Sequence, residues 1–426
     1  MLGLMTRFAA IFVVVLSIGL SGCREAPPQF QANGVRALSL ERSRSVPTEA
    51  AAADVSAVVS QLFGTPGSPK WPAGLLADDD QRQLVSPDRL AQAAGGVTSD
   101  EANLHTGLYQ EHCVICHAVS GSGNGPASRF QVPYPRDFRV GIFKWKSTRR
   151  SSKPTRDDLT QILKNGIPGS PMPSFAIVRP SEIDALVDYV IYLSVRGEVE
   201  RELLGRAVDE LDYDTGPPEE ELRLTLVSTG DGDAVREGSE TGDDAGADSD
   251  GADAELTEGQ AMVVEVLQDV VDSWVNVEPS LVPPRPQDTD LAASIGRGKE
   301  IYHGQVANCV GCHGTDGAGG LPSLDYDDWT KDFTTRIGVS PDDKAAVKPF
   351  RKAGALPPRA IDPRVLAGGV IHGGSDPETI YRRIHEGIAG TPMPSMDIDE
   401  NANAGTGLTP DQAWDLVNYV ESIIKP

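Results

Sequence analysis

Hydrophobic residues recur at helical spacing in several separate stretches of this chain. Between residues 53 and 64 they place five apolar side chains on one face of a helix: Val55, Val58, Val59, Leu62 and Phe63. The stretches SEIDALVDYVIYL, from residue 181, and TPDQAWDLVNYVESII, from residue 409, show the same amphipathic spacing. Because 44 glycines and 32 prolines interrupt the chain, we expect many loops and no long sheets. The pattern therefore predicts a mainly α-helical protein.

Polar residues at the starts of these stretches support helices there. Ser181 with Asp184, and Thr409 with Gln412, fit the side-chain pairs that cap the first turn of a helix. The stretch TEGQAMVVEVLQDVVDSWVNV, from residue 257, has the same start signal and an apolar face. We expect this third helix to pack between two larger units of the chain.

The first 23 residues contain a basic Arg7, an apolar core and the ending Leu-Ser-Gly-Cys. The core is too short to span a bilayer comfortably and ends in small residues, which favours an export signal over a membrane helix. The ending resembles the lipobox of bacterial lipoproteins, which implies lipidation of Cys23. A plain signal peptide that contains a cysteine is the alternative. We therefore expect an exported, periplasmic protein that is anchored to a membrane by lipid.

An acidic stretch divides the chain. Residues 209–258 contain 18 acidic and two basic side chains, so they carry −16 of the net charge of −24. The centre of this stretch has few apolar residues and cannot bury much surface. We expect a partly disordered spacer there.

The remaining cysteines are few and grouped. Cys113 and Cys116 lie in EHCVICH, and Cys309 and Cys312 lie in NCVGCH. Two cysteines at this spacing can each form a thioether to one vinyl group of a single porphyrin, and the histidine that follows then lies beneath the iron. In an exported protein the motif predicts c-type haem attachment, here twice, with His117 and His313 as proximal ligands.

Two thiol-based alternatives compete with haem attachment. A four-cysteine zinc site can be built from two Cys-x-x-Cys pairs, but it usually closes over a loop of about 15–20 residues. These two pairs are almost two hundred residues apart. A dithiol redox pair needs neither the histidine nor a second copy of the motif. Haem attachment is therefore the favoured interpretation.

A methionine in a common sequence frame follows each haem motif. Met172 lies in GIPGSPMPSF, and Met393 lies in GIAGTPMPSM. Proline on both sides removes backbone donors and blocks a helix, so the segment stays extended and can offer its thioether to iron. We therefore predict Met172 and Met393 as the distal ligands.

Other residues recur in the same order and indicate an internal duplication. A proline stands nine residues after each proximal histidine, at Pro126 and Pro322. Asp137-Phe138 in the first half is matched by Asp332-Phe333 in the second. Each methionine is followed by one of the amphipathic helices.

Each half thus resembles a class I cytochrome c domain, and the whole resembles a membrane-anchored dihaem cytochrome c. The resemblance implies two small helical folds, each with one covalent haem c held between His117 and Met172 or between His313 and Met393. It also implies that the carbonyls of Pro126 and Pro322 accept the second N–H of the proximal histidines.

The resemblance defines five segments. They are a signal peptide (1–22), a tether with a small helical region (23–98), a first cytochrome c domain (99–197), an acidic linker with one helix (198–290) and a second cytochrome c domain (291–426). The second domain departs from the first in two places. Its histidine and methionine are 80 residues apart against 55, and GQVA is inserted before Cys309, which leaves the local helix geometry open.

Five histidines lie outside the haem motifs: His105, His112, His303, His372 and His385. Any of them could replace a methionine as iron ligand, with a lower reduction potential. His385 precedes Met393 by eight residues, as Lys164 precedes Met172, which favours a surface position. His372, in the longer loop, is the strongest alternative ligand.

Residues 129–156 contain nine Arg or Lys against Asp137 alone. Arg139, Lys144 and Trp145 are candidate partners of haem propionates. The excess positive charge fits either the docking of an acidic redox partner or a solvated loop. Nucleic acid is not an expected partner of an exported acidic haem protein.

Histidine and methionine together fill both axial positions of a haem iron. The predicted function is therefore electron transfer between redox protein partners, without catalysis and without a small-molecule substrate. One alternative is a dihaem peroxidase-like enzyme, which needs an open position on iron. Another is a haem subunit of a larger respiratory oxidoreductase complex.

Overall fold

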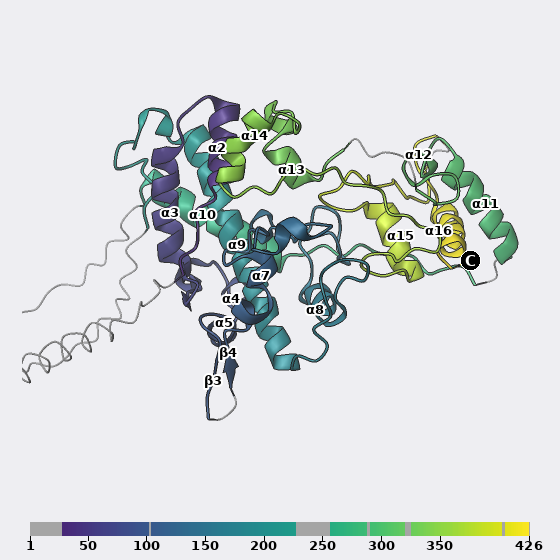
Figure 1. The fold of residues 1–426 in the computed structure, drawn as a ribbon, viewed down its shortest axis with the longest axis horizontal. Helices are drawn as coiled ribbons and strands as arrows, with labels where there is room; N and C mark the ends of the chain where they lie inside the picture. Colours follow the sequence, from purple (N-terminus) through teal and green to yellow (C-terminus); the bar gives the residue numbers. More distant parts are fainter. Residues whose placement is uncertain are drawn as a thin grey trace, which may run out of the picture.

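The computed structural model describes residues 28–101, 104–226, 256–287, 290–319, 325–402 and 405–425. The predicted signal peptide, Cys23, Pro322 and most of the acidic spacer lie outside the described residues. The described chain forms two helical lobes of unequal size, with the C-terminus in the smaller one (Figure 1). Among the described residues, no helix has both the length and the apolar character needed to cross a membrane.

The larger lobe is built from the first half of the chain and one later helix. Its α-helices are α2 (Gly34–Arg44), α3 (Glu49–Phe63), α4 (Asp79–Arg82), α5 (Pro87–Ala93), α6 (Leu108–His112), α7 (Val114–His117), α8 (Arg156–Asn165), α9 (Pro180–Glu210) and α10 (Glu258–Val275). Its 3-10 helices are η1 (Ala73–Leu75), η2 (Ser128–Phe130), η3 (Phe138–Val140) and η4 (Tyr213–Thr215). Its strands form two short antiparallel hairpins, β1 (Gly64–Thr65) with β2 (Ser68–Pro69) and β3 (Thr98–Ser99) with β4 (His105–Thr106).

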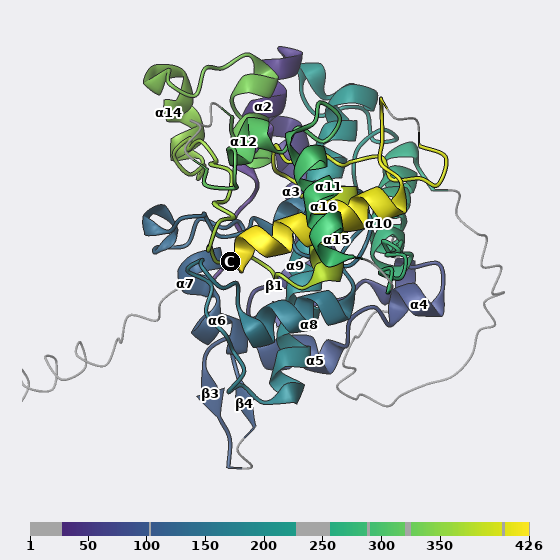
Figure 2. The same ribbon diagram turned by 90° about the vertical axis from the view of Figure 1, so that its right-hand side faces the viewer.

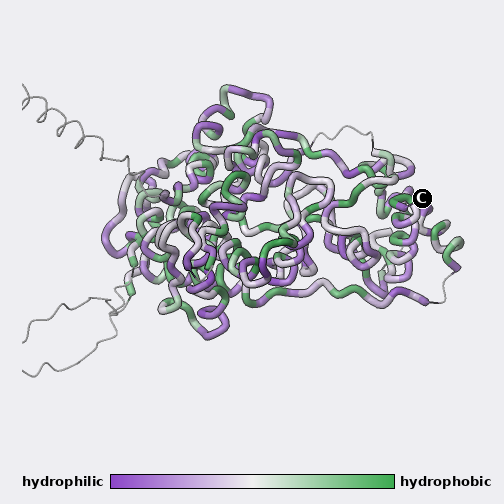
Figure 3. The backbone as a smooth tube through the Cα atoms, turned by 60° about the horizontal axis from the view of Figure 1, so that its bottom comes forward, coloured by the Kyte–Doolittle hydropathy of each residue, from purple (hydrophilic) through white to green (hydrophobic). Residues whose placement is uncertain are grey.

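Helix α9 is the centre of the larger lobe. It extends well beyond the predicted stretch, and α3, α5, α8 and α10 pack around it. Its first turn also differs from the prediction, because Pro180 holds the first helical position, for which its fixed φ is suited, and Arg179 is the N-cap. Buried hydrophobic residues from Leu40 to Trp274 form one continuous core around it. Figure 3 shows hydrophobic segments running through this lobe.

Helix α10 belongs to the same core. Thr257 and Gln260 cap its start reciprocally, as the sequence predicted. Its buried face, which includes Val263, Leu267 and Trp274, packs toward α9, and the helix also contacts α4. Because this face completes the larger lobe, α10 does not lie between the two lobes, and that expectation is wrong.

The smaller lobe contains α11 (Leu291–His303), α12 (Val310–His313), α15 (Pro377–Glu386) and α16 (Pro410–Ile424). Helices α11 and α16 cross closely, as Figure 2 shows. At the crossing a Cβ atom on Gly298 would lie 2.0 Å from the carbonyl oxygen of Asp415, so a glycine is required there. Tyr302 and Tyr419 pack edge to face beside it, with ring centroids 5.2 Å apart.

The longer loop of the second half forms α13 (Asp328–Asp332), η5 (Thr335–Ile337) and α14 (Lys344–Lys352). These helices lie beside α2 on the larger lobe, away from the rest of the second half (Figure 1). They have a small core of their own: Phe333, Val339, Val347, Phe350 and Ala355. This core packs on Val35 and Leu38 of α2, so the loop ties the second half of the chain to the first.

Candidate functional site

Both Cys-x-x-Cys-His motifs fold into the same local structure. The last four residues of each motif form a one-turn helix, α7 or α12, capped by the first cysteine. A tyrosine hydroxyl donates to the carbonyl after each histidine, from Tyr109 to Ala118 at 2.9 Å and from Tyr302 to Gly314 at 3.0 Å. The inserted GQVA changes how the chain enters the second motif, because α11 already ends at His303 whereas α6 runs up to the first cysteine of its motif. The one-turn helix and its tyrosine contact are the same in both motifs.

A backbone carbonyl orients the histidine of each motif. Nδ1 of His117 lies 3.0 Å from the carbonyl oxygen of Arg136, and Nδ1 of His313 lies 2.9 Å from that of Arg364. Because Nδ1–H donates in both cases, Nε2 keeps a lone pair for a metal. Burial lowers the pKa of His117 to about 4, so this imidazole is neutral.

These carbonyls correct the predicted roles of the two prolines. Pro126 is exposed, and the partner of His117 is Arg136 instead. Pro322 lies outside the described residues, and the partner of His313 is Arg364.

The repeat also aligns differently from the sequence prediction. Its matching positions are Pro135-Arg136 and Pro363-Arg364, and the arginine comes 19 residues after the first histidine but 51 after the second. Asp332-Phe333 belongs to the insertion and does not match Asp137-Phe138. Sequence matching at equal spacing failed because α13 and α14 are inserted between the histidine and its partner.

The two methionine loops share the same hydrogen bonds. The N–H of Ile167 donates to the carbonyl of Met172 at 3.1 Å, and that of Ile388 donates to the carbonyl of Met393 at 3.3 Å. Each methionine N–H donates to a side-chain hydroxyl two residues earlier at 3.2 Å. The repeated frame therefore encodes one loop structure twice.

A glycine with positive φ begins each loop. Gly166 has φ +64° and Gly387 has φ +67°, and a Cβ atom on either would approach the backbone of the proline after the methionine to 2.6 Å. Any other residue would be strained and would push this proline away. Each glycine thus fixes the path of the chain that carries the methionine.

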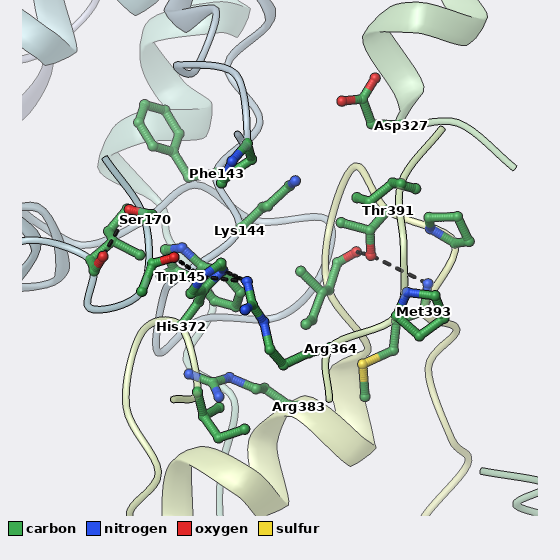
Figure 4. A pocket seen from close by; sticks show the side chains of 18 of the residues that line it. Phe143, Lys144, Trp145, Ser170, Asp327, Arg364, His372, Arg383, Thr391 and Met393 are labelled. Atoms are coloured by element: carbon green, nitrogen blue, oxygen red, sulfur yellow. Dashed lines mark hydrogen bonds between the residues drawn. The ribbon is translucent and has the colours of Figure 1, made fainter. Parts of the chain in front are cut away.

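One cavity of about 1600 Å³ is lined by both motif histidines, all four motif cysteines and both methionines. Single small-molecule sites usually measure about 300–1,000 Å³, so this space exceeds the need of one ligand. Lys144 and Trp145 of the larger lobe and Arg364 and Arg383 of the smaller lobe face one another in it (Figure 4). The two motifs therefore open into a shared interior.

Comparison with known proteins agrees with this geometry. The cytochrome c family model matches residues 106–194 and 295–423, just over half of the chain. The chain belongs to the cytochrome c family. Each match contains one Cys-x-x-Cys-His motif and one methionine loop, so the protein has two cytochrome c domains, as the sequence predicted.

Comparisons with curated proteins and with solved structures identify no further family. No curated protein matches the chain. Among solved structures, the chain is similar to a chain of the Kuenenia stuttgartiensis reducing HAO-like protein complex, with 22% sequence identity and a TM-score of 0.43. The similarity covers 75% of this chain and 94% of that chain.

Two cytochrome c domains imply covalent haem c, and the charges in the cavity fit its carboxylates. Burial lowers the pKa of Arg136 to about 10, of Lys144 to about 7 and of Arg383 to about 10. Nη1 of Arg136 is buried and has no hydrogen-bond partner among the described residues. Buried cations of this kind need anions, which the haem propionates would provide.

Most charges of the basic segment 129–156 are partly buried. Lys144 and Trp145 line the cavity, and their role as partners of haem propionates stays a prediction, but Arg139 donates to Asp137 at 2.8 and 2.9 Å and does not line the cavity. Of the nine basic residues, only Arg129 and Arg149 are exposed. Most charges of the segment are therefore partly covered, and the docking of an acidic partner there stays a prediction.

The cysteine thiols are unlike those of a redox pair. Burial raises the pKa of Cys113 to about 12 and of Cys309 to about 11, whereas reactive dithiols have a lowered pKa. The four described cysteines form no disulfide. In the described ranges no three Cys, His, Asp or Glu side chains gather as a metal site, and the cysteine pairs lie in separate domains.

Of the five histidines outside the motifs, His112 and His372 line the cavity. His112 packs edge to face on Phe175, with ring centroids 5.8 Å apart. Both ring nitrogens of His372 contact protein groups, Arg364 and the carbonyl of Gly169, so neither is free to bind iron. His385 lies beside Glu386 and Tyr381, outside the cavity lining.

Proposed function

We propose that the protein transfers electrons through two covalently bound haem c groups, each held by a histidine and a methionine. His117 and Met172 hold the first haem, and His313 and Met393 hold the second. The bound iron supplies the reversible change between ferric and ferrous states. Cys113 with Cys116, and Cys309 with Cys312, form the thioethers.

The observation that carries this proposal is the repeated methionine loop. Both loops begin with a glycine of positive φ and have the same backbone hydrogen bonds. Both methionines and both proximal histidines line one cavity, and Nε2 of each histidine keeps a lone pair for iron. Two filled axial positions favour outer-sphere electron transfer over a peroxidase-like reaction, which needs an open iron position. The shared cavity also favours electron exchange between the two haems.

We further propose that the protein is exported and held at a membrane by lipid on Cys23. The apolar N-terminal segment with its Leu-Ser-Gly-Cys ending supports this placement. In a bacterial host, the Cys23→Ala variant should then move from the membrane fraction to the soluble fraction. A variant that stays in the membrane fraction contradicts lipid anchoring through this residue.

The purified haem-loaded protein tests the ligand assignment. Intact-mass measurement should show two covalent haem groups, and the oxidised protein should show the absorption band of methionine sulfur bound to ferric iron. Carbon monoxide should leave the spectrum of the reduced protein nearly unchanged, because no axial position is open.

Two matched variants show how the spectrum and the midpoint potential change when one methionine ligand is lost. Met172→His and Met393→His should each remove part of the sulfur band and lower the midpoint potential of one haem. A shift of the reduced spectrum by carbon monoxide in the unmodified protein would show an open iron and would favour catalysis. Absence of covalent haem would exclude the proposal altogether.

A further inference from the structure

The first methionine loop is held by a residue of the second domain. His372 is buried at the boundary between the domains, and its Nε2 lies 3.0 Å from the carbonyl oxygen of Gly169, three residues before Met172. Nη2 of Arg364 lies 2.9 Å from Nδ1 and also contacts Nε2. Trp145 of the first domain packs edge to face on the ring, with centroids 6.2 Å apart (Figure 4).

These contacts favour one proton position on the histidine. Nη2 of Arg364 can only donate and contacts both ring nitrogens, whereas the carbonyl of Gly169 can only accept. A neutral ring with its proton on Nε2 fits the Gly169 carbonyl, and Nδ1 then accepts from Arg364. The neighbourhood agrees, because burial and the charges of Arg364, Lys144 and Arg383 all lower the pKa of His372.

The second methionine loop is held by a residue of the first domain. Arg150 donates from Nη1 to the carbonyl oxygen of Met393 at 2.9 Å and from Nη2 to that of Thr391 at 3.3 Å. Its backbone N–H also donates to the carboxylate of Glu386 at 2.8 Å. A forked cation thus binds two carbonyls of the loop that carries Met393.

The two methionine loops have the same internal hydrogen bonds, but the donors that bind their carbonyls from other segments differ. Gly390 matches Gly169 in position, and its carbonyl accepts from the N–H of Asp328 at 3.2 Å, within the second domain. At Gly169 the corresponding donor is His372, from the other domain. The first domain therefore has no equivalent of α13, and its methionine loop receives this contact from the second domain.

We propose that each domain positions the distal methionine of the other, with His372 holding the Met172 loop and Arg150 holding the Met393 loop. This inference depends on the proposed function, since it assumes that both methionines bind iron. A loop fixed at its carbonyls would hold its methionine thioether in place for a haem iron. Loosening the loop weakens the sulfur bond and lowers the potential of that haem.

Crosswise variants of the full haem-loaded protein test the proposal. His372→Leu, in the second domain, should lower the midpoint potential of the first haem and reduce its share of the sulfur band. Arg150→Gln, in the first domain, should do the same to the second haem. The Met172→His and Met393→His variants identify which redox wave belongs to which haem.

Conservative and neighbouring variants provide the controls. His372→Gln keeps a donor for Gly169 and should restore part of the wild-type potential, and Arg150→Lys should restore part of the other. Arg149→Gln removes an exposed arginine beside Arg150, and His303→Gln removes a histidine outside the cavity lining. Both should titrate like the unmodified protein.

Each outcome decides the question. A shift confined to the haem of the variant's own domain, or unchanged waves with a full sulfur band, overturns the crosswise arrangement while the proposed ligation stands. A missing sulfur band in the unmodified protein overturns methionine ligation and this inference together.

Discussion

Glu198 shows how single buried charges hold the larger lobe together. Its carboxylate pairs with Lys153 and accepts from Nε1 of Trp274 at 2.8 Å, so it joins α9, α10 and the segment that carries the cavity cations. Burial raises its pKa. The backbone at Gly141 passes so close that a Cβ atom there would overlap the carboxylate.

Removing this carboxylate should be costly. Glu198→Ala leaves the mostly buried Lys153 without an anion, and breaking a buried pair in this way typically costs about 3–5 kcal/mol in the free energy of unfolding. Urea unfolding of the haem-loaded protein measures the loss. Glu202→Ala, at an exposed position of the same helix, is the matched control and should change stability by no more than about 0.5 kcal/mol. Equal stability of both variants would contradict a structural role for the pair.

At the level of elements, the inserted helix α14 determines how the second half of the chain is attached to the first. Phe350 and Val347 of α14 are buried against α2, although they are far from it in sequence. Asn124 of the first domain also donates to the carbonyl of Gly354 at 2.9 Å, just after this helix. The insertion thus contacts the larger lobe at two places, α2 and Asn124.

Phe350→Ala should release this insertion. Deleting a buried phenylalanine typically lowers the free energy of unfolding by about 3–5 kcal/mol. We expect this loss to exceed the stability of a small separate cluster. Amide hydrogen exchange should therefore accelerate in α14 and α2, while the haem spectrum stays unchanged. Lys348→Ala, at an exposed position of α14, should leave exchange unaltered. Unchanged protection in Phe350→Ala would show that other contacts dock the insertion.

For the whole molecule, the boundary between the domains contains a histidine, His372, whose titration should affect stability in mild acid. The folded protein lowers the pKa of His372 below its ordinary value of about 6.5. A group with a lowered pKa in the folded state binds fewer protons there than in the unfolded chain. Its contribution to stability is therefore present above about pH 6.5 and is lost as the pH falls through the folded pKa.

A pH series measures this contribution. The free energy of unfolding of the haem-loaded protein should fall as the pH drops below about 6.5, because a protonated His372 would face Arg364, Arg383 and Lys144. His372→Gln should fall less steeply over the same range, and the difference between the two curves isolates this residue. Parallel curves would show that other groups cause the acid response.

The sequence by itself determined the local chemistry. Cys-x-x-Cys-His, the Pro-Met-Pro frames and the amphipathic helices each depend on residues close together in the chain, so spacing and side-chain type suffice to predict them. The cytochrome c family and the two-domain, mainly helical fold are confirmed on this basis. The iron ligands and the lipid anchor stay predictions.

Only the tertiary structure decided which distant residues meet. The partners of the histidines, Arg136 and Arg364, could have been suggested by the Pro-Arg pair after each motif, but the insertion of α13 and α14 concealed their equivalence. The partial burial of the basic segment and the contacts of Arg150 and His372 have no local signal at all. They depend on the packing of two domains against each other, which no pattern along a single chain records.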